Sequence, residues 1–249
     1  MVNNLSPSDT IRSTLTRITR LRQTAAENPE LSQAVSAIKQ FQARRFAGTY
    51  TDLLQSKPYR SAALFFLEEL YGEKDYSERD SQFARVAGAL ERIFPRQAVQ
   101  AAVSLAQLHL LTEEFDLAMA QIWVANMDKN EVARYIAAWR AVDRRSDRSI
   151  QIATVLNIGQ ELDELTRITG LRLMLKMMRG PANVAGLRSL QRFIEAGFDT
   201  FAAMGKQGQG AAHFIETVRA RESGLVDRLF DAPVLDCEKE LTQILGQVW

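Results

Sequence analysis

Residues 96–127 read RQAVQAAVSLAQLHLLTEEFDLAMAQIWVANM, and this stretch decides the fold class. It contains neither proline nor glycine, so nothing in it interrupts a helix, and Pro95 stands directly before it. Its seam positions recur in alternating steps of three and four residues, which is the spacing of helices packed in a bundle. We therefore predict one long bundle helix, whose seam contains Leu105, Leu108, Thr112, Phe115, Met119 and Ile122.

Helical signals continue on both sides of this segment. Asn28 is followed by proline and glutamate, an order that favours an N-cap and a first helical turn. Residues 77–80, Ser-Glu-Arg-Asp, resemble a capping box with Asp in place of the usual Glu or Gln. No stretch alternates apolar and polar residues for long enough to predict a strand. We expect an all-α, compact multi-helix bundle of about ten helices, in a single domain (1–249) with a weak seam near 127–128.

The composition is that of a soluble globular protein. The 249 residues are 46% apolar and 24% charged, and the formal net charge is only +1. Such a small net charge argues against nucleic acid as a partner. No apolar run is long enough to span a membrane, and the single cysteine, Cys237, cannot form an intramolecular disulfide. We therefore expect a cytoplasmic protein without a membrane span.

Sequence motifs of several enzyme classes are missing. The chain has no phosphate-binding G-x-x-x-x-G-K-[ST], no dinucleotide-binding G-x-G-x-x-G and no nucleophile elbow G-x-S-x-G. It has only two histidines, and neither follows a glutamate at the third position, as di-iron bundle sites require. We assign no catalytic residue and no cofactor, and leave open whether the protein is an enzyme.

One set of residues has the spacing of metal ligands. His109, Glu113 and Asp116 fall at positions i, i+4 and i+7 of the predicted long helix, so they share one face. These side-chain types suit zinc or manganese, but only one of them supplies nitrogen. A local His–Glu hydrogen bond or a solvated face accounts for the same letters. The three residues stay candidate metal ligands.

A second stretch, AALFFLEELYGEKDYSERD (residues 62–80), combines an aromatic run, two glutamates and a charged exit. The aromatic run favours a helix buried on most of its circumference, ended by Gly72. We expect Phe65 or Phe66 in the core, and one of two adjacent glutamates half-buried against an arginine. A core helix with a polar exit is the favoured interpretation of this stretch, and a working site is the alternative.

This stretch also carries a resemblance to a known family. Together with MRGPANVAGLRSLQRFIEAGF (178–198) and FIETVRARE (214–222), the pattern FFLxxLYG…RD resembles an uncharacterised all-helical family of bacterial, mainly proteobacterial, proteins. The resemblance covers roughly residues 40 to 230. It implies a bacterial, cytoplasmic protein, and it implies no activity, cofactor or catalytic residue.

Two functional hypotheses follow. The first is a non-enzymatic helical binding or scaffold protein that takes a protein partner or self-associates as a homo-oligomer, motivated by Trp123, Trp139 and Trp249 and by an amphipathic N-terminal helix. The alternative is a bundle that encloses a site for a metal, a tetrapyrrole or an apolar small molecule near His109.

Overall fold

The computed structural model describes residues 5–69, 75–126, 130–205 and 210–247, and these residues form helices without a strand. The all-α prediction is confirmed. Thirteen helices, not about ten, are present in the described part, because several short helices join the long ones. They are α1 (Pro7–Ala26), α2 (Pro29–Thr49), α3 (Thr51–Gln55), α4 (Arg60–Glu69), α5 (Ser77–Ile93), α6 (Arg96–Val124), α7 (Glu131–Val142), α8 (Arg145–Thr166), α9 (Leu171–Met177), α10 (Arg179–Val184), α11 (Arg188–Met204), α12 (Gly210–Asp231) and α13 (Val234–Leu245).

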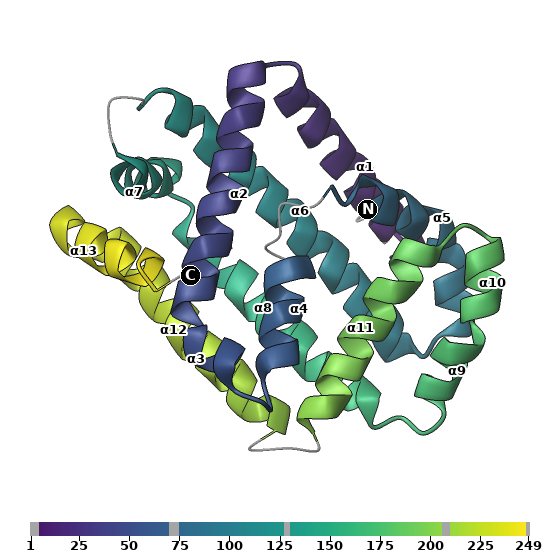
Figure 1. Cartoon of the computed structure of the whole chain (residues 1–249). Coiled ribbons are helices and arrows are strands. Elements are labelled where there is room, and N and C mark those ends of the chain that lie inside the picture. The colour runs from purple at the N-terminus through teal and green to yellow at the C-terminus, as the bar shows by residue number, and fades with distance from the viewer. Residues whose placement is uncertain (1–4, 70–74, 127–129, 206–209, 248–249) are drawn as a thin grey trace.

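The long helix predicted from residues 96–127 is α6, and it organises the bundle. It runs diagonally across the whole molecule behind α2 (Figure 1) and packs against α1, α2, α5, α7 and α8. Phe115 and Met119, two of its seam residues, are completely buried. Glu113 and Asp116 are buried on the same helix, which means that α6 also carries charge into the interior.

The helix ends follow local chemistry, with one error in prediction. Asn28 caps α2 as expected, because its Oδ1 accepts hydrogen bonds from the backbone N–H groups of Glu30 and Leu31 at 3.0 and 3.3 Å. The prediction of a capping box at residues 77–80 is wrong. The side chain of Asp75 accepts the N–H of Ser77 at 2.9 Å instead, and Asp80 is buried inside the bundle.

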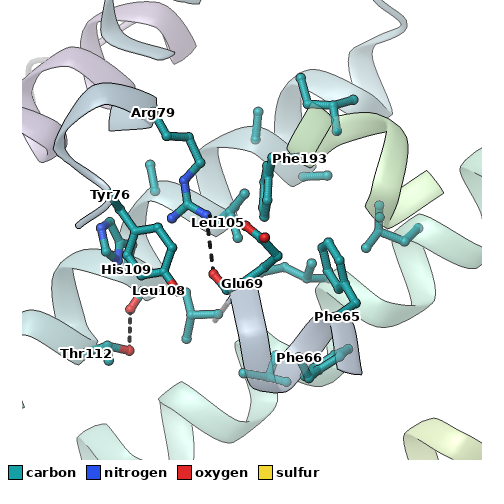
Figure 2. Close-up of a pocket in the computed structure, with 18 of the residues that line it drawn as sticks. Phe65, Phe66, Glu69, Tyr76, Arg79, Leu105, Leu108, His109, Thr112 and Phe193 are labelled. Carbon is teal, nitrogen blue, oxygen red and sulfur yellow. Dashed lines mark hydrogen bonds and ion pairs between the residues drawn. The ribbon is translucent and has the colours of Figure 1, made fainter. Parts of the chain in front are cut away.

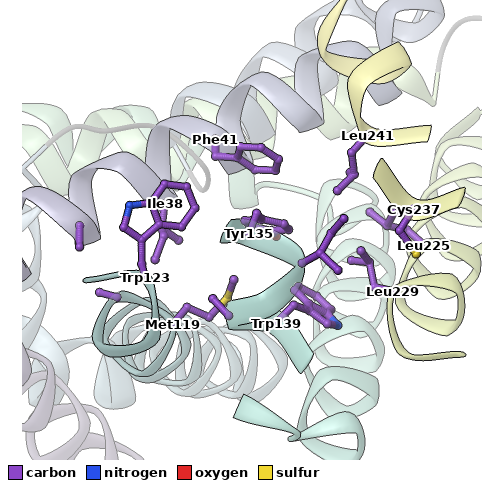
Figure 3. Packing of buried hydrophobic residues seen from close by; sticks show 14 of the residues in the cluster. Ile38, Phe41, Met119, Trp123, Tyr135, Trp139, Leu225, Leu229, Cys237 and Leu241 are labelled. Atoms are coloured by element: carbon purple, nitrogen blue, oxygen red, sulfur yellow. The ribbon is translucent and has the colours of Figure 1, made fainter. Parts of the chain in front are cut away.

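One of the two main apolar clusters of the described residues lies where α2, α6, α7, α12 and α13 meet (Figure 3). The rings of Phe41 and Tyr135 stack there with centroids 4.1 Å apart. Cys237 is buried in the same cluster and its thiol donates to the carbonyl of Arg228 at 3.2 Å. Two of the three tryptophans, Trp123 and Trp139, are part of this core; Trp249 lies outside the described residues.

Helices from the two sides of position 127–128 pack against each other. α2 contacts both α6 and α13, and α4 contacts α11. Gly197 permits the second of these contacts, because a Cβ at this position of α11 would lie 3.2 Å from Cζ of Phe65. Within the described residues, no helix is long and apolar enough to cross a membrane.

Candidate functional site

A cavity of about 240 Å³ lies inside the bundle, mainly between α4, α5, α6, α8 and α11. Every lining residue of the described chain is buried or half-buried, and most are apolar. Figure 2 shows part of its wall: Phe65 and Phe193 lie on one side, Tyr76 and His109 on the other, and the side chains of Arg79 and Glu69 lie between them. The interior therefore offers a largely apolar space, partly open to solvent, with a few polar groups in its wall.

The stretch 62–80 forms much of that wall. Phe65 and Phe66 are buried, as predicted, and Glu69 is half-buried against Arg79 while Glu68 is exposed, which confirms the expected asymmetry of the two glutamates. Gly72 lies outside the described residues. The stretch is thus both a core helix and the wall of a cavity; its six lining residues are Phe65, Phe66, Glu69, Tyr76, Arg79 and Asp80.

Arg79 lies between two aromatic rings. Its Cζ is 4.1 Å from the centroid of Tyr76 and 4.5 Å from that of Phe193 (Figure 2). Its Nη1 donates to the backbone carbonyl of Glu69 at 3.3 Å and lies 3.5 Å from the carboxylate of the same residue. Its Nε is 3.9 Å from Asp80. The stacking fixes the plane of the guanidinium, while its contacts to carboxylates are long.

His109 lines the cavity next to this arginine and is held by Asp80. The His109 Nε2 and Asp80 Oδ2 atoms are 3.1 Å apart, and Arg22 Nη1 donates to the same carboxylate oxygen at 2.9 Å. Arg22 Nη2 lies 3.0 Å from His109 Nε2, but it also donates to Glu113 at 2.9 Å. A proton on Nε2 of His109 that is donated to Asp80 fits this arrangement best, because the N–H groups of Arg22 then donate to the carboxylates of Asp80 and Glu113.

The predicted metal ligands do not converge. The guanidinium of Arg22 stands between His109 and Glu113, and Lys39 Nζ lies 3.0 Å from Glu113 and 3.9 Å from Asp116. Protein cations thus occupy the positions that a metal ion would take. In the described parts of the chain, no three His, Cys, Asp or Glu side chains are grouped closely enough to hold a metal ion. This arrangement does not support a metal site at His109, Glu113 and Asp116, which stays a prediction.

These charged residues shift one another's pKa values. Burial raises the pKa of Asp80, but the hydrogen bond and charge of His109 and the charge of Arg22 outweigh it and hold the pKa below its usual range. The pKa of Glu113 is also below its usual range, because burial raises it but the charges of Lys39 and Arg22 lower it more. Asp116 differs: its complete burial raises its pKa to about 6, against the opposing charge of Lys39 and a hydrogen bond from Gln42 at 3.1 Å.

A family model described as a domain of unknown function (DUF8198) matches residues 21–234. The chain belongs to this family. The match includes every residue that lines the cavity except Leu15, so the cavity lies within the family's domain. No curated protein and no solved structure matches the chain.

Polar groups also line the cavity away from His109, where α2, α7, α8 and α12 meet. Arg45 pairs with Glu222 at 2.5 Å, and the cation of Arg148 lies 3.6 and 3.9 Å from the ring centroids of Phe115 and Trp139. The indole N–H of Trp139 is buried and has no acceptor among the described residues. An enclosed ligand with an acceptor atom, or a water molecule, would satisfy it.

Sequence reasoning named His109 but missed the residues that hold it. Arg22 and Asp80 come from α1 and α5, and no spacing along α6 indicates them. The signal available was the letter Asp80 itself, which departs from the usual capping box. Asp80 places a carboxylate in the first turn of α5, where it is buried inside the bundle.

Proposed function

We propose that the protein binds a small, mostly apolar molecule in the cavity between α4, α5, α6, α8 and α11. The observation that carries the proposal is the cavity itself, with its apolar walls and its few polar groups. Such a combination is typical of small-molecule sites between the helices of a bundle. We place this activity in the bacterial cytoplasm, in keeping with the single buried cysteine and the family resemblance.

The size of the cavity supports a binding role. Natural cores contain few voids larger than a water molecule. At roughly 24 cal/mol per Å³ of empty volume, a void of 240 Å³ would cost about 6 kcal/mol, a large part of the ~5–15 kcal/mol that stabilises a folded domain. A bound molecule that fills the space would recover much of this free energy.

The cavity also limits the ligand. Its volume exceeds the roughly 150 Å³ of an engineered cavity that admits benzene, but it is below the ~300–1,000 Å³ of pockets for drug-sized ligands. A tetrapyrrole is larger than this space, and Nε2 of His109 already contacts Asp80 and Arg22. Of the three ligand types considered for this site, the apolar small molecule is the best supported.

The alternative of a scaffold protein has lost part of its motivation. Trp123 and Trp139 are buried in the core, and the amphipathic helix α1 packs its apolar face on α5 and α6. A protein partner or a homo-oligomer stays a prediction, which sedimentation of the purified protein tests directly.

Two measurements test the proposal. Native mass spectrometry of the purified protein, followed by denaturation and extraction, should detect a retained small molecule. Toluene, a probe without a polar group, should raise the melting temperature of the emptied protein, and the rise should grow with the logarithm of its concentration above the Kd, because a ligand that binds only the folded state stabilises it.

A pair of variants locates the site. Ala102→Leu places a larger side chain in the cavity wall on α6, and Gln107→Leu makes a leucine on the exposed face of the same helix. We expect Ala102→Leu to weaken the toluene effect while it folds at least as stably as the parent, since it fills part of the empty volume. Gln107→Leu should bind like the parent. A parent protein that retains no molecule and does not respond to toluene contradicts the proposal.

A further inference from the structure

Arg79 is a cation of the cavity wall whose contacts to carboxylates are long. Arg22 contacts Asp80 at 2.9 Å, and Arg45 contacts Glu222 at 2.5 Å. The nearest carboxylate oxygens to Arg79 belong to Glu69 and Asp80, at 3.5 and 3.9 Å. Charge-assisted hydrogen bonds of this kind are usually ~2.7–2.9 Å long, so neither contact is a full one.

Neither neighbouring carboxylate is well placed to improve its contact with Arg79. Asp80 already accepts from Arg22 and from His109. Glu69 stands on the last turn described for α4, and its side chain keeps 27% of its surface exposed. Its contact with Arg79, at 3.5 Å, is longer than the one that a ligand carboxylate could make.

The electrostatic balance at Arg79 points the same way. Burial lowers the pKa of Arg79, and the charges of Asp80 and Glu69 offset that effect only in part. Burial acts on Arg22 as well, yet Glu113 and Asp80 together raise the pKa of that residue. An additional negative group would therefore be stabilised beside Arg79 more than beside Arg22.

The geometry defines where such a group would bind. The rings of Tyr76 and Phe193 cover the guanidinium, so its in-plane N–H groups are the ones left to bind an anion, and two of them match the two oxygens of a carboxylate. Phe65 and Leu105 provide an apolar wall next to this edge (Figure 2).

We propose that the ligand of the cavity is a small organic acid, whose carboxylate binds Arg79 and whose apolar body lies against Phe65, Phe193 and Leu105. This inference rests on the proposed function above. Glu69 occupies the carboxylate position loosely in the absence of the acid and is displaced when the acid binds. The ligand class is thus a monocarboxylic acid with a body of about the size of a phenyl ring.

The test uses three compounds that share one body: 3-phenylpropanoate, 3-phenylpropanamide and 3-phenylpropanol. Titration calorimetry on the emptied full-length protein should give at least about tenfold tighter binding for the acid than for the amide and the alcohol, since hydrogen bonds between charged groups are the strong ones. Arg79→Met should reduce this preference to about threefold or less. Arg92→Met, an exposed arginine on the same helix α5 that does not line the cavity, should keep it.

A second variant covers the case in which Arg79→Met does not fold. Glu69→Gln removes the competing carboxylate, and it should strengthen binding of the acid severalfold while it leaves the amide unchanged. Equal binding of acid and amide by the parent, or weaker binding of the acid by Glu69→Gln, overturns the inference. If toluene still binds in that case, the proposed function stands and only the acid is wrong. If neither toluene nor any of the three compounds binds, the proposed function itself fails.

Discussion

Asp116 provides the sharpest test of the charged interior. Its side chain is 2% exposed and accepts a hydrogen bond from Gln42, and its Oδ2 lies 3.9 Å from Nζ of Lys39. Burial raises its pKa to about 6, and the charge of Glu113 acts in the same direction. We predict that Asp116→Asn removes a specific part of the pH dependence of stability, because asparagine can accept the same hydrogen bond without a charge.

The sign and size follow from the two pKa values. Between the unfolded pKa of about 3.9 and the folded pKa of about 6, the native state of the parent keeps a proton that the unfolded state has lost. This contribution to stability is therefore present at low pH and is lost as the pH rises through about 6. With these values, the free energy of unfolding contributed by Asp116 falls by about 2 kcal/mol between pH 4.5 and pH 7.5.

Urea denaturation at pH 4.5, 5.5, 6.5 and 7.5 measures the effect. The stability of Asp116→Asn minus that of the parent should increase by about 2 kcal/mol across this range, whatever constant cost the buried amide adds. The control is Asp227→Asn, an exposed aspartate of α12, whose difference from the parent should stay within ~0.5 kcal/mol. A difference for Asp116→Asn that is flat with pH, or that decreases, refutes the assignment of a raised pKa to this carboxyl.

Three further predictions concern folding, and urea denaturation at neutral pH checks each of them. Arg22→Met should cost ~3–5 kcal/mol, because it leaves Asp80 and Glu113 buried without their shared guanidinium; a loss below 1 kcal/mol would mean that Lys39 and His109 suffice. Phe66→Ala should cost ~3–5 kcal/mol, because it enlarges the cavity. The control, Ser61→Ala at an exposed position of the same helix, should change stability by less than ~0.5 kcal/mol. Equal free energies of unfolding for the two variants would contradict the burial of Phe66 in the core. Gly48→Ala should cost roughly 1–3 kcal/mol or more, because its Cβ would lie 2.0 Å from the carbonyl oxygen of Ile244 and must displace α13. Hydrogen exchange should then show faster opening of α13. An exchange rate in α13 equal to that of the parent would disprove this contact.

Local signals in the sequence determined which segments are helices. The break at Pro95, the uninterrupted run from 96 to 127 and the cap at Asn28 act within one or two turns, so they are readable without knowledge of the neighbours. The same is true of the burial of Phe65 and Phe66 and of the pairing of one glutamate with an arginine, since the composition of that helix leaves few other arrangements. The number of helices expected from the sequence was too low, because short helices such as α3 and α10 give only weak hydrophobic periodicity.

Only the tertiary structure decided what the charged letters do. His109, Glu113 and Asp116 share a face of α6 as predicted, but whether that face meets a metal, water or other side chains depends on the helices opposite. Arg22 arrives there from 87 residues away along the chain and Lys39 from 74 residues before Glu113, and both fill the space between the presumed ligands. The cavity has the same origin, because its wall combines side chains from helices that are distant in sequence and exists only where their packing leaves volume unfilled.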